Sequence, residues 1–232
     1  MILRIPVAVL MVCSARLAVG QEMLIPSDQD ASAQVARIVA SARSQGLPTN
    51  PIVGKVNYGV RVTRAPAGKI VESAKLIATR LEIAREALQP NPTVPEIEGG
   101  AAALGENATT ESLKAVRSAG GSRSVATALG VLTQLLANKM PIDSATKIVT
   151  DLLRRGATPE QLVAFQGNVS ADVARGYDVM EAADLRARGL VAAMGSGTAS
   201  GAFTSADVEA SAVTSGRNNP PGTPPKTPPR RP

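Results

Sequence analysis

The chain has 232 residues, of which 44% are hydrophobic and only 2% aromatic, so one ordinary domain with tails and a core of Ala, Val, Leu and Ile is expected. It has no His and one Cys, Cys13, which excludes histidine-dependent catalysis and histidine metal sites. The net charge of +6 comes from the two ends of the chain, because the other 19 basic residues are balanced by 19 acidic ones. The neutral middle of the chain predicts no basic binding face there. The basic residues of the ends are Arg4, Arg16, Arg217, Lys226, Arg230 and Arg231.

Residues 1–20 have the pattern of a secretory signal peptide. Arg4 precedes an apolar stretch over 5–12, and Ala18-Val19-Gly20 places small residues before a cut at Gln21. A cut after Ala15 is an alternative, and so is lipidation at Cys13, although Val12 is large for that signal. Cleavage at either later site leaves a chain without Cys or disulfide. No later apolar run reaches the roughly 20 residues of a membrane helix.

The first predicted helices follow this leader. Residues 21–34 are predicted to form a partly helical N-terminal segment of the mature chain. A helix is predicted over 28–44, and Gly46 follows it as a C-terminal stop. Pro51 opens a helix to about Val62. Pro66 opens the clearest helix, in which apolar residues recur every three or four positions from Ile70 to Leu88.

A second group of helices is predicted after a proline-rich linker at 89–96. Short helices are predicted over 95–104 and 110–118, and a break at 119–122 precedes helices marked by the apolar residues of 125–136 and 145–153. Pro159 opens another helix, and a last one covers 177–194. Since no stretch alternates with period two, an all-α domain is expected over 35–194. Lys-Ile-Val occurs at 69–71 and 147–149, which suggests halves at 35–88 and 123–194 joined by 89–122.

One short phrase recurs at 47–53, 65–71, 108–114, 140–146 and 157–163. In its clearest copy Thr158 is a helix N-cap, Pro159 occupies the first helical position and Gln161 completes a capping box. Glu111, Asp143 and Glu160 fall in or beside first turns, where a carboxylate favours the helix dipole. The phrase is therefore interpreted as a repeated helix start and not as a reactive site.

Few residues qualify as catalytic candidates. The carboxylate pairs Asp28/Asp30, Glu82/Glu86 and Glu96/Glu98 lie at predicted helix starts or on a polar helix face, so a dipole-complementing or solvated role is favoured. Ser144 and Lys147 are three residues apart, which any helix brings to one face. No catalytic, cofactor or metal-binding residue is assigned.

The last segment, 195–232, is Gly/Ser-rich and then basic and proline-rich, which is typical of disorder. It contains Pro-x-x-Pro at 221–224 and 225–228, and Arg217, Lys226, Arg230 and Arg231 could contact a partner protein or an anionic envelope component. An inert solubilising tail is the alternative. Nucleic-acid binding is not expected, because aromatic residues for stacking are nearly absent.

Three stretches, GLPTNPIVGKV (46–56), RAPAGKIV (64–71) and the segment 124–145, together with the Pro/Arg tail, carry a resemblance. The chain resembles a group of secreted, Ala/Val-rich helical bacterial proteins that has no assigned activity, so the resemblance implies no site residues. The function expected is an exported, non-enzymatic envelope scaffold or protein-interaction module. The alternatives are a periplasmic carrier of an apolar ligand and a hydrolase with a Ser/Lys or carboxylate site.

Overall fold

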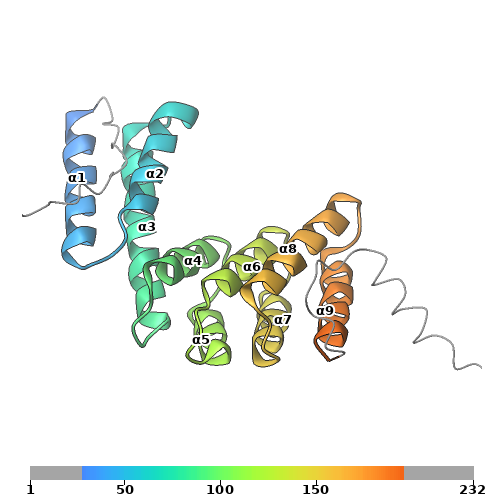
Figure 1. The fold of residues 1–232 in the computed structure, drawn as a ribbon. Coiled ribbons are helices and arrows are strands. Elements are labelled where there is room, and N and C mark those ends of the chain that lie inside the picture. Colours follow the sequence, from blue (N-terminus) through green and yellow to red (C-terminus); the bar gives the residue numbers. More distant parts are fainter. Residues whose placement is uncertain (1–27, 196–232) are drawn as a thin grey trace, which may run out of the picture. The chain divides into compact units, whose positions relative to one another are not determined.

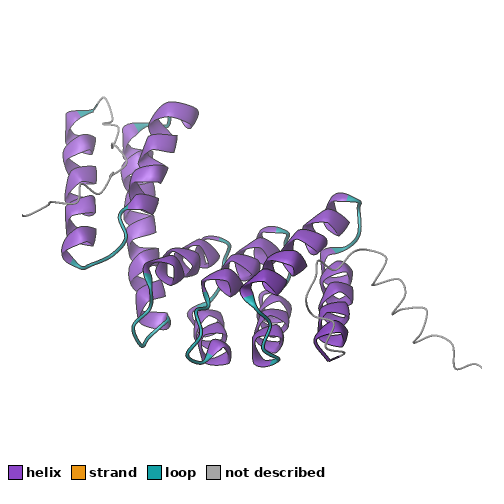
Figure 2. Ribbon diagram, in the orientation of Figure 1, coloured by secondary structure: helices purple, strands orange, loops and turns teal. Residues whose placement is uncertain are grey.

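The structure is a computed structural model that describes residues 28–195, and the predicted leader and tail lie outside these residues. The described residues form helices joined by short turns, with no strand among them (Figures 1 and 2). The predicted all-α fold is confirmed. The helices are α1 Gln29–Ser44, α2 Asn50–Tyr58, η1 Gly59–Thr63, α3 Ala67–Ala87, α4 Val94–Gly105, α5 Thr110–Gly120, α6 Ala126–Ala137, α7 Ile142–Arg154, α8 Pro159–Ala174 and α9 Val179–Gly195.

The helix predicted from Pro51 differs from expectation at its end. After Tyr58 the backbone widens into the π-helical turn η1, which closes where the Ala65 N–H donates to the Gly59 carbonyl over 3.0 Å. Three of the five residues of η1 are β-branched, and such side chains crowd the preceding turn of an α-helix. Arg64 then ends the turn in a left-handed conformation, with φ of 47°.

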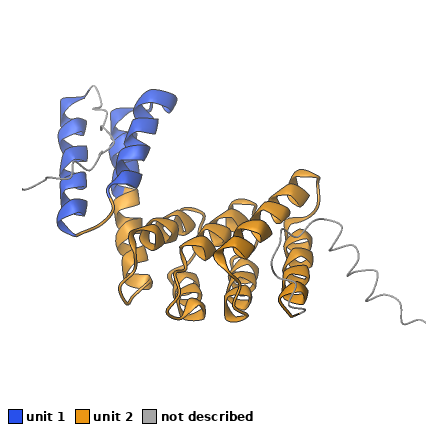
Figure 3. Cartoon of the chain, viewed as in Figure 1, with its two compact units in different colours: residues 1–45, 49–75 blue, residues 46–48, 76–232 orange. Residues whose placement is uncertain are grey.

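The chain divides into two compact units whose boundary lies within α3, between residues 75 and 76 (Figure 3). The first unit comprises α1, α2, η1 and the start of α3, and the second comprises the rest of α3 and α4 to α9. This division differs from the predicted halves 35–88 and 123–194. The expected joining segment 89–122 contains α4 and α5, which belong to the second unit.

The first unit buries one apolar face of each of its helices. In Figure 1, α1, α2 and the start of α3 lie side by side. All of the buried side chains are aliphatic, and most of them are β-branched valine and isoleucine or the small alanine. They are Ala31, Val35, Val39 and Ala42 from α1, Ile52, Val53 and Val56 from α2, and Ile70, Val71 and Ala74 from α3.

In the second unit, α4 to α9 form three consecutive helix pairs, called hairpins here, in two layers. One layer consists of α4, α6 and α8, in which α6 packs against both neighbours, and the other consists of α5, α7 and α9, in which α7 does so. The first helices of the hairpins begin at Val94, Ala126 and Pro159, which are 32 and 33 residues apart. This near-constant spacing and the layered contacts define an array of helical repeats, in which each hairpin packs mainly on the next.

The recurring phrase marks how these helices are joined. Each of the five copies directly follows a residue with positive φ. In the second unit this residue is part of a Schellman ending, as where the Ala157 N–H donates to the Leu152 carbonyl over 3.0 Å and Gly156 donates to Leu153. The first residue of the phrase is buried at Leu47, Ala108, Met140 and Ala157. The phrase is therefore a helix-to-helix connector, and the positive-φ residues that precede its copies are Gly46, Arg64, Asn107, Lys139 and Gly156.

Candidate functional site

The predicted tail contacts, Arg217, Lys226, Arg230 and Arg231, lie outside the described residues. The predicted capping box at α8 is confirmed, because the Thr158 N–H donates to Gln161 Oε1 over 2.9 Å and the Gln161 N–H donates to Thr158 Oγ1 over 3.3 Å. Of the first carboxylate pair, Asp28 is the N-cap of α1 and accepts from the backbone of Asp30. These side chains are thus occupied with helix starts.

The pair Glu96/Glu98 separates into two different environments. Glu98 is half-buried, whereas Glu96 has only 2% of its surface exposed at the start of α4. The backbone N–H and hydroxyl of Thr93 donate to Glu96 Oε2 over 2.8 and 3.0 Å. The Val125 N–H donates to Oε1 over 2.9 Å and Arg117 Nη1 over 3.1 Å. Glu96 therefore caps its own helix and also holds the start of α6.

Burial acts to raise the pKa of Glu96, but the hydrogen bonds from Thr93 and Val125 and the charge of Arg117 outweigh it and leave the pKa below its usual value. The carboxylate is consequently ionised and fully engaged. Acid catalysis needs the opposite arrangement, a carboxyl group with a raised pKa that faces a substrate. The surroundings of Glu96 indicate a structural role.

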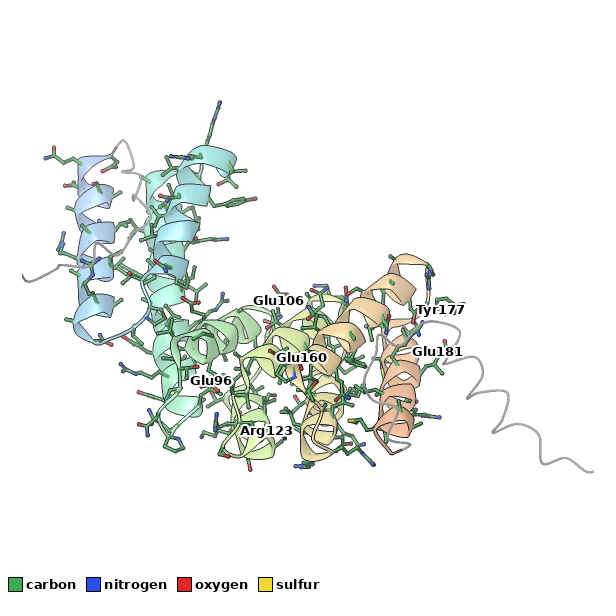
Figure 4. The ribbon with its side chains drawn as sticks, in the orientation of Figure 1. Glu96, Glu106, Arg123, Glu160, Tyr177 and Glu181 are labelled. Carbon is green, nitrogen blue, oxygen red and sulfur yellow. The ribbon has the colours of Figure 1, made fainter. Side chains whose placement is uncertain are left out.

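Two arginines extend this cluster across the second unit. Arg117 also donates to the carbonyls of Gly121 and Arg123. Arg123 in turn donates to the carbonyls of Leu153 and Ala157 at the end of α7. Figure 4 labels Glu96 and Arg123. The cluster links α4, α5, the loop before α6 and the C-terminus of α7.

A second buried ion pair fixes the last hairpin. Arg186 of α9 donates from Nε and Nη2 to the two carboxylate oxygens of Asp172 in α8, over 2.6 and 2.9 Å. Arg175 adds a contact of 3.2 Å. The hydrogen bonds from Arg186 are the largest influence on Asp172, and although burial opposes them, they hold the pKa of this carboxyl below its usual value. Sequence reasoning missed this pair, because its members are 14 residues apart and each resembles a surface charge.

Ser144 and Lys147 lie together in an open groove of about 350 Å³ between α7 and α9. The Lys147 ammonium donates to Asp151 over 3.1 Å, and 78% of the lysine side chain is exposed. A lysine that serves as a base needs a desolvated neutral amine, so this exposed ion pair does not support a Ser/Lys nucleophile. The groove is also lined by Met140, Ile148, Met180, Glu181 and Asp184.

The outward surface of α4, α6 and α8 differs from the rest of the array. α6 has no charged residue in its sequence, and the only charged side chains on the outward surfaces of α4 and α8 are Glu98 and Glu160. α5, α7 and α9 instead carry mixed charges, including ion pairs of Asp151 with Lys147 and Arg154. We call this surface of α4, α6 and α8, which is nearly uncharged, the even-helix face. Its central residues are Ala102 on α4, Gly130, Gln134 and Ala137 on α6, and Val163, Gly167 and Ala171 on α8.

Two glycines of the even-helix face have no internal role. A Cβ added to Gly130 or Gly167 would meet no atom within 4 Å, and neither residue has positive φ. By contrast, a Cβ on Gly100 would lie 3.0 Å from Ala84 and Leu88 side-chain atoms, so that glycine serves the packing of α4 on α3. A glycine inside a helix costs about 1 kcal/mol relative to alanine. Gly130 and Gly167 each destabilise their helix by this amount, although no contact within the described chain requires a glycine there.

Within residues 28–195, no group of three or more His, Cys, Asp or Glu side chains is placed to hold a metal ion. None of the helices described is both long and apolar enough to span a bilayer. Comparison with known proteins found no matching protein-family model, no matching curated protein and no matching solved structure.

Proposed function

We propose that the protein is an exported, non-enzymatic scaffold that binds a partner protein on the even-helix face of its helical array. Arrays of helical hairpins present extended surfaces that bind other chains. The observation that carries the proposal is the segregation of charge: the outward surface of α4, α6 and α8 is nearly uncharged, whereas the other layer carries mixed charges. Interface cores are depleted of charged residues relative to the remaining surface.

The small residues of the even-helix face support the same proposal. Side chains at Ala102, Gly130 and Gly167 are minimal or absent, so the backbone of a partner chain can approach these helices closely. Such contacts also immobilise few flexible side chains, which lowers the entropic cost of binding. The export and envelope location in the proposal rest on the leader at 1–20, and the tail at 217–232 is proposed as a second, salt-sensitive contact.

The test is crosslinking and capture from the native envelope fraction with matched variants. Gly167→Arg places a long cation on the even-helix face where the added side chain meets open space. Ser118→Arg places the same side chain at an exposed position of α5 and is the control. Both variants should keep the helical circular dichroism and urea midpoint of the parent chain.

We expect one discrete partner with the parent chain and with Ser118→Arg, and at least a ten-fold lower recovery with Gly167→Arg, since a desolvated cation in an interface core costs well over the 1.4 kcal/mol of one decade. A chain ending at Gly216, compared at low and high salt, measures the contribution of the tail. Equal recovery with Gly167→Arg and Ser118→Arg would refute the even-helix face as the binding surface. Loss only on tail removal would move the function to 217–232.

A further inference from the structure

The first unit is rich in basic residues and poor in acidic ones, whereas the described part of the second unit has nearly equal numbers of both. The neutral sum over the middle of the sequence conceals a stretch from Ala31 to Val71 that contains no acidic residue. Only Asp28 and Asp30 precede it within the described residues, and Glu72 follows it. The expectation of no basic face rested on the charge summed over the whole middle of the sequence, which includes both units. The basic residues of this stretch are Arg37, Arg43, Lys55, Arg61, Arg64 and Lys69.

Several of these cations gather where α2 passes through η1 into α3. Lys55, Arg61 and Arg64 are exposed within ten residues of each other. Lys69 is exposed at the start of α3 and forms an ion pair of 2.9 Å with Glu72, which is the acidic residue that contacts this region. We call residues 55–64 the basic turn. Its three cations have no acidic partner among the contacts that the structure shows.

The basic turn also exposes apolar side chains. Tyr58 is 50% exposed and Val62 is 63% exposed, so one aromatic and one aliphatic side chain lie at the surface among the cations. The Lys55 ammonium lies 5.6 Å from the centroid of the Tyr58 ring, so the ring is held beside a cation. The basic turn contains the π-helical backbone of η1 and the left-handed Arg64, and π-helical turns occur frequently at functional sites.

We propose that the basic turn is a docking surface for an anionic phospholipid bilayer. Three unopposed cations match a negative membrane surface, where each Lys or Arg strengthens binding by about five-fold. A tyrosine and an aliphatic side chain between those cations match the interfacial region, in which aromatic rings sit at the level of the headgroups. A purely anionic polymer would satisfy the cations but would leave Val62 in water.

The composition of the turn also disfavours single-stranded nucleic acid as the occupant. Such ligands bind through a series of aromatic side chains on which successive bases stack, and the basic turn offers only Tyr58. The proposal does not depend on the even-helix face, since all residues of the basic turn belong to the first unit.

The test measures binding of the purified full chain, with its N-terminus identified by mass spectrometry, to vesicles of phosphatidylcholine with and without phosphatidylglycerol. Arg61→Gln combined with Arg64→Gln should weaken binding to the anionic vesicles by about 25-fold, because two cations are lost. Lys114→Gln combined with Arg155→Gln removes the same charge from exposed positions of the second unit and should leave binding unchanged. Arg230→Gln combined with Arg231→Gln isolates the tail.

A fluorescence measurement separates insertion from charge attraction alone. The chain has no tryptophan and only two tyrosines, so Tyr177→Phe leaves Tyr58 as the sole emitter. Tyr58 emission should be quenched by lipids brominated on the acyl chain near the headgroup. Val62→Ser should weaken vesicle binding by several-fold without changing the urea midpoint, since Val62 is mostly exposed.

Three results would overturn the proposal. One is equal binding by the Arg61→Gln/Arg64→Gln variant of the basic turn and its charge-matched control. Another is loss of binding only in the tail variant. The third is tight binding to an anionic polysaccharide or an oligonucleotide with no binding to vesicles at the same salt concentration.

Discussion

Substitution of Glu96 by glutamine should destabilise the second unit strongly although it changes only one atom. The amide oxygen of a glutamine at position 96 can still accept from Val125 N–H, but its NH₂ group cannot accept the hydrogen bonds from Thr93, and Arg117 loses its buried counter-charge. Hydrogen bonds to charged groups contribute about 1.5–3 kcal/mol each, so a net loss of about 2–3 kcal/mol is expected. Glu96→Ala, which also leaves the buried Val125 N–H without an acceptor, should cost about 3–5 kcal/mol.

The assay is urea denaturation followed by helical circular dichroism, with hydrogen exchange of peptides from 94–125 to locate the effect. Glu98→Gln is the matched control, because Glu98 lies on the same helix, is half-buried and has no comparable network; it should change stability by less than about 0.5 kcal/mol. Equal losses for Glu96→Gln and Glu98→Gln would show that the buried cluster does not stabilise the fold as argued.

The pH dependence of the same variant has a definite sign. Since the pKa of Glu96 is lower in the folded than in the unfolded chain, its contribution is fully present above the unfolded value of about 4.5 and is lost as the pH falls through the lower folded value. The stability difference between the parent chain and Glu96→Gln should therefore be constant near neutral pH and shrink under acidic conditions. A difference that grows as the pH falls would contradict the depressed pKa.

Three further predictions concern the last hairpin and the glycines. Arg186→Ala should lower the free energy of unfolding by about 3–5 kcal/mol, because it removes the main counter-charge of the buried Asp172, and Asp172→Leu with Arg186→Met should restore most of that loss. Arg188→Ala, at an ion pair in which 78% of the arginine side chain is exposed, should cost under about 1 kcal/mol in the same urea titration. Gly130→Ala should raise thermal stability by about 1 kcal/mol, while Gly156→Ala, at φ of 89°, should lower it by about 1 kcal/mol. A gain of stability in Gly156→Ala would refute the connector assignment. Gly100→Ala should lower stability, as calorimetry would show, because its Cβ would press on Ala84 and Leu88 at 3.0 Å.

The helices were predictable because their signals are local. Proline and threonine at starts such as Thr158-Pro159, and apolar residues three or four positions apart, act within one or two turns of chain. Those signals specify where a helix begins and which face is buried. The same signals identified the repeated phrase in the sequence. The left-handed ending of the helix before each copy was recognised only from the backbone φ angles.

The buried polar residues were not predictable, because their partners are distant in sequence. Glu96 resembles any first-turn acid until the Val125 N–H, 29 residues later, is brought to it. The basic turn was missed for a different reason, since a charge sum over the whole middle of the chain cancels the cations of 31–71 against acidic residues elsewhere in the sequence. Counting charges along shorter windows would have found it.

The polar clusters and the even-helix face together show how the second unit can be stable without packing contacts on the surface that we propose for binding. Its core is built mainly of leucine, valine and alanine, with Ile97, Met140 and one phenylalanine, Phe165, and such side chains can slide past each other with little loss of buried area. The Glu96 cluster and the Asp172–Arg186 pair join successive helices through directional contacts that a shifted packing would break. Because these contacts lie inside the hairpins and at their ends, the outward surface of α4, α6 and α8 does not have to stabilise the fold. That surface can therefore keep glycines at 130 and 167, although alanine would favour the helix, and these glycines leave the backbone accessible to the proposed partner.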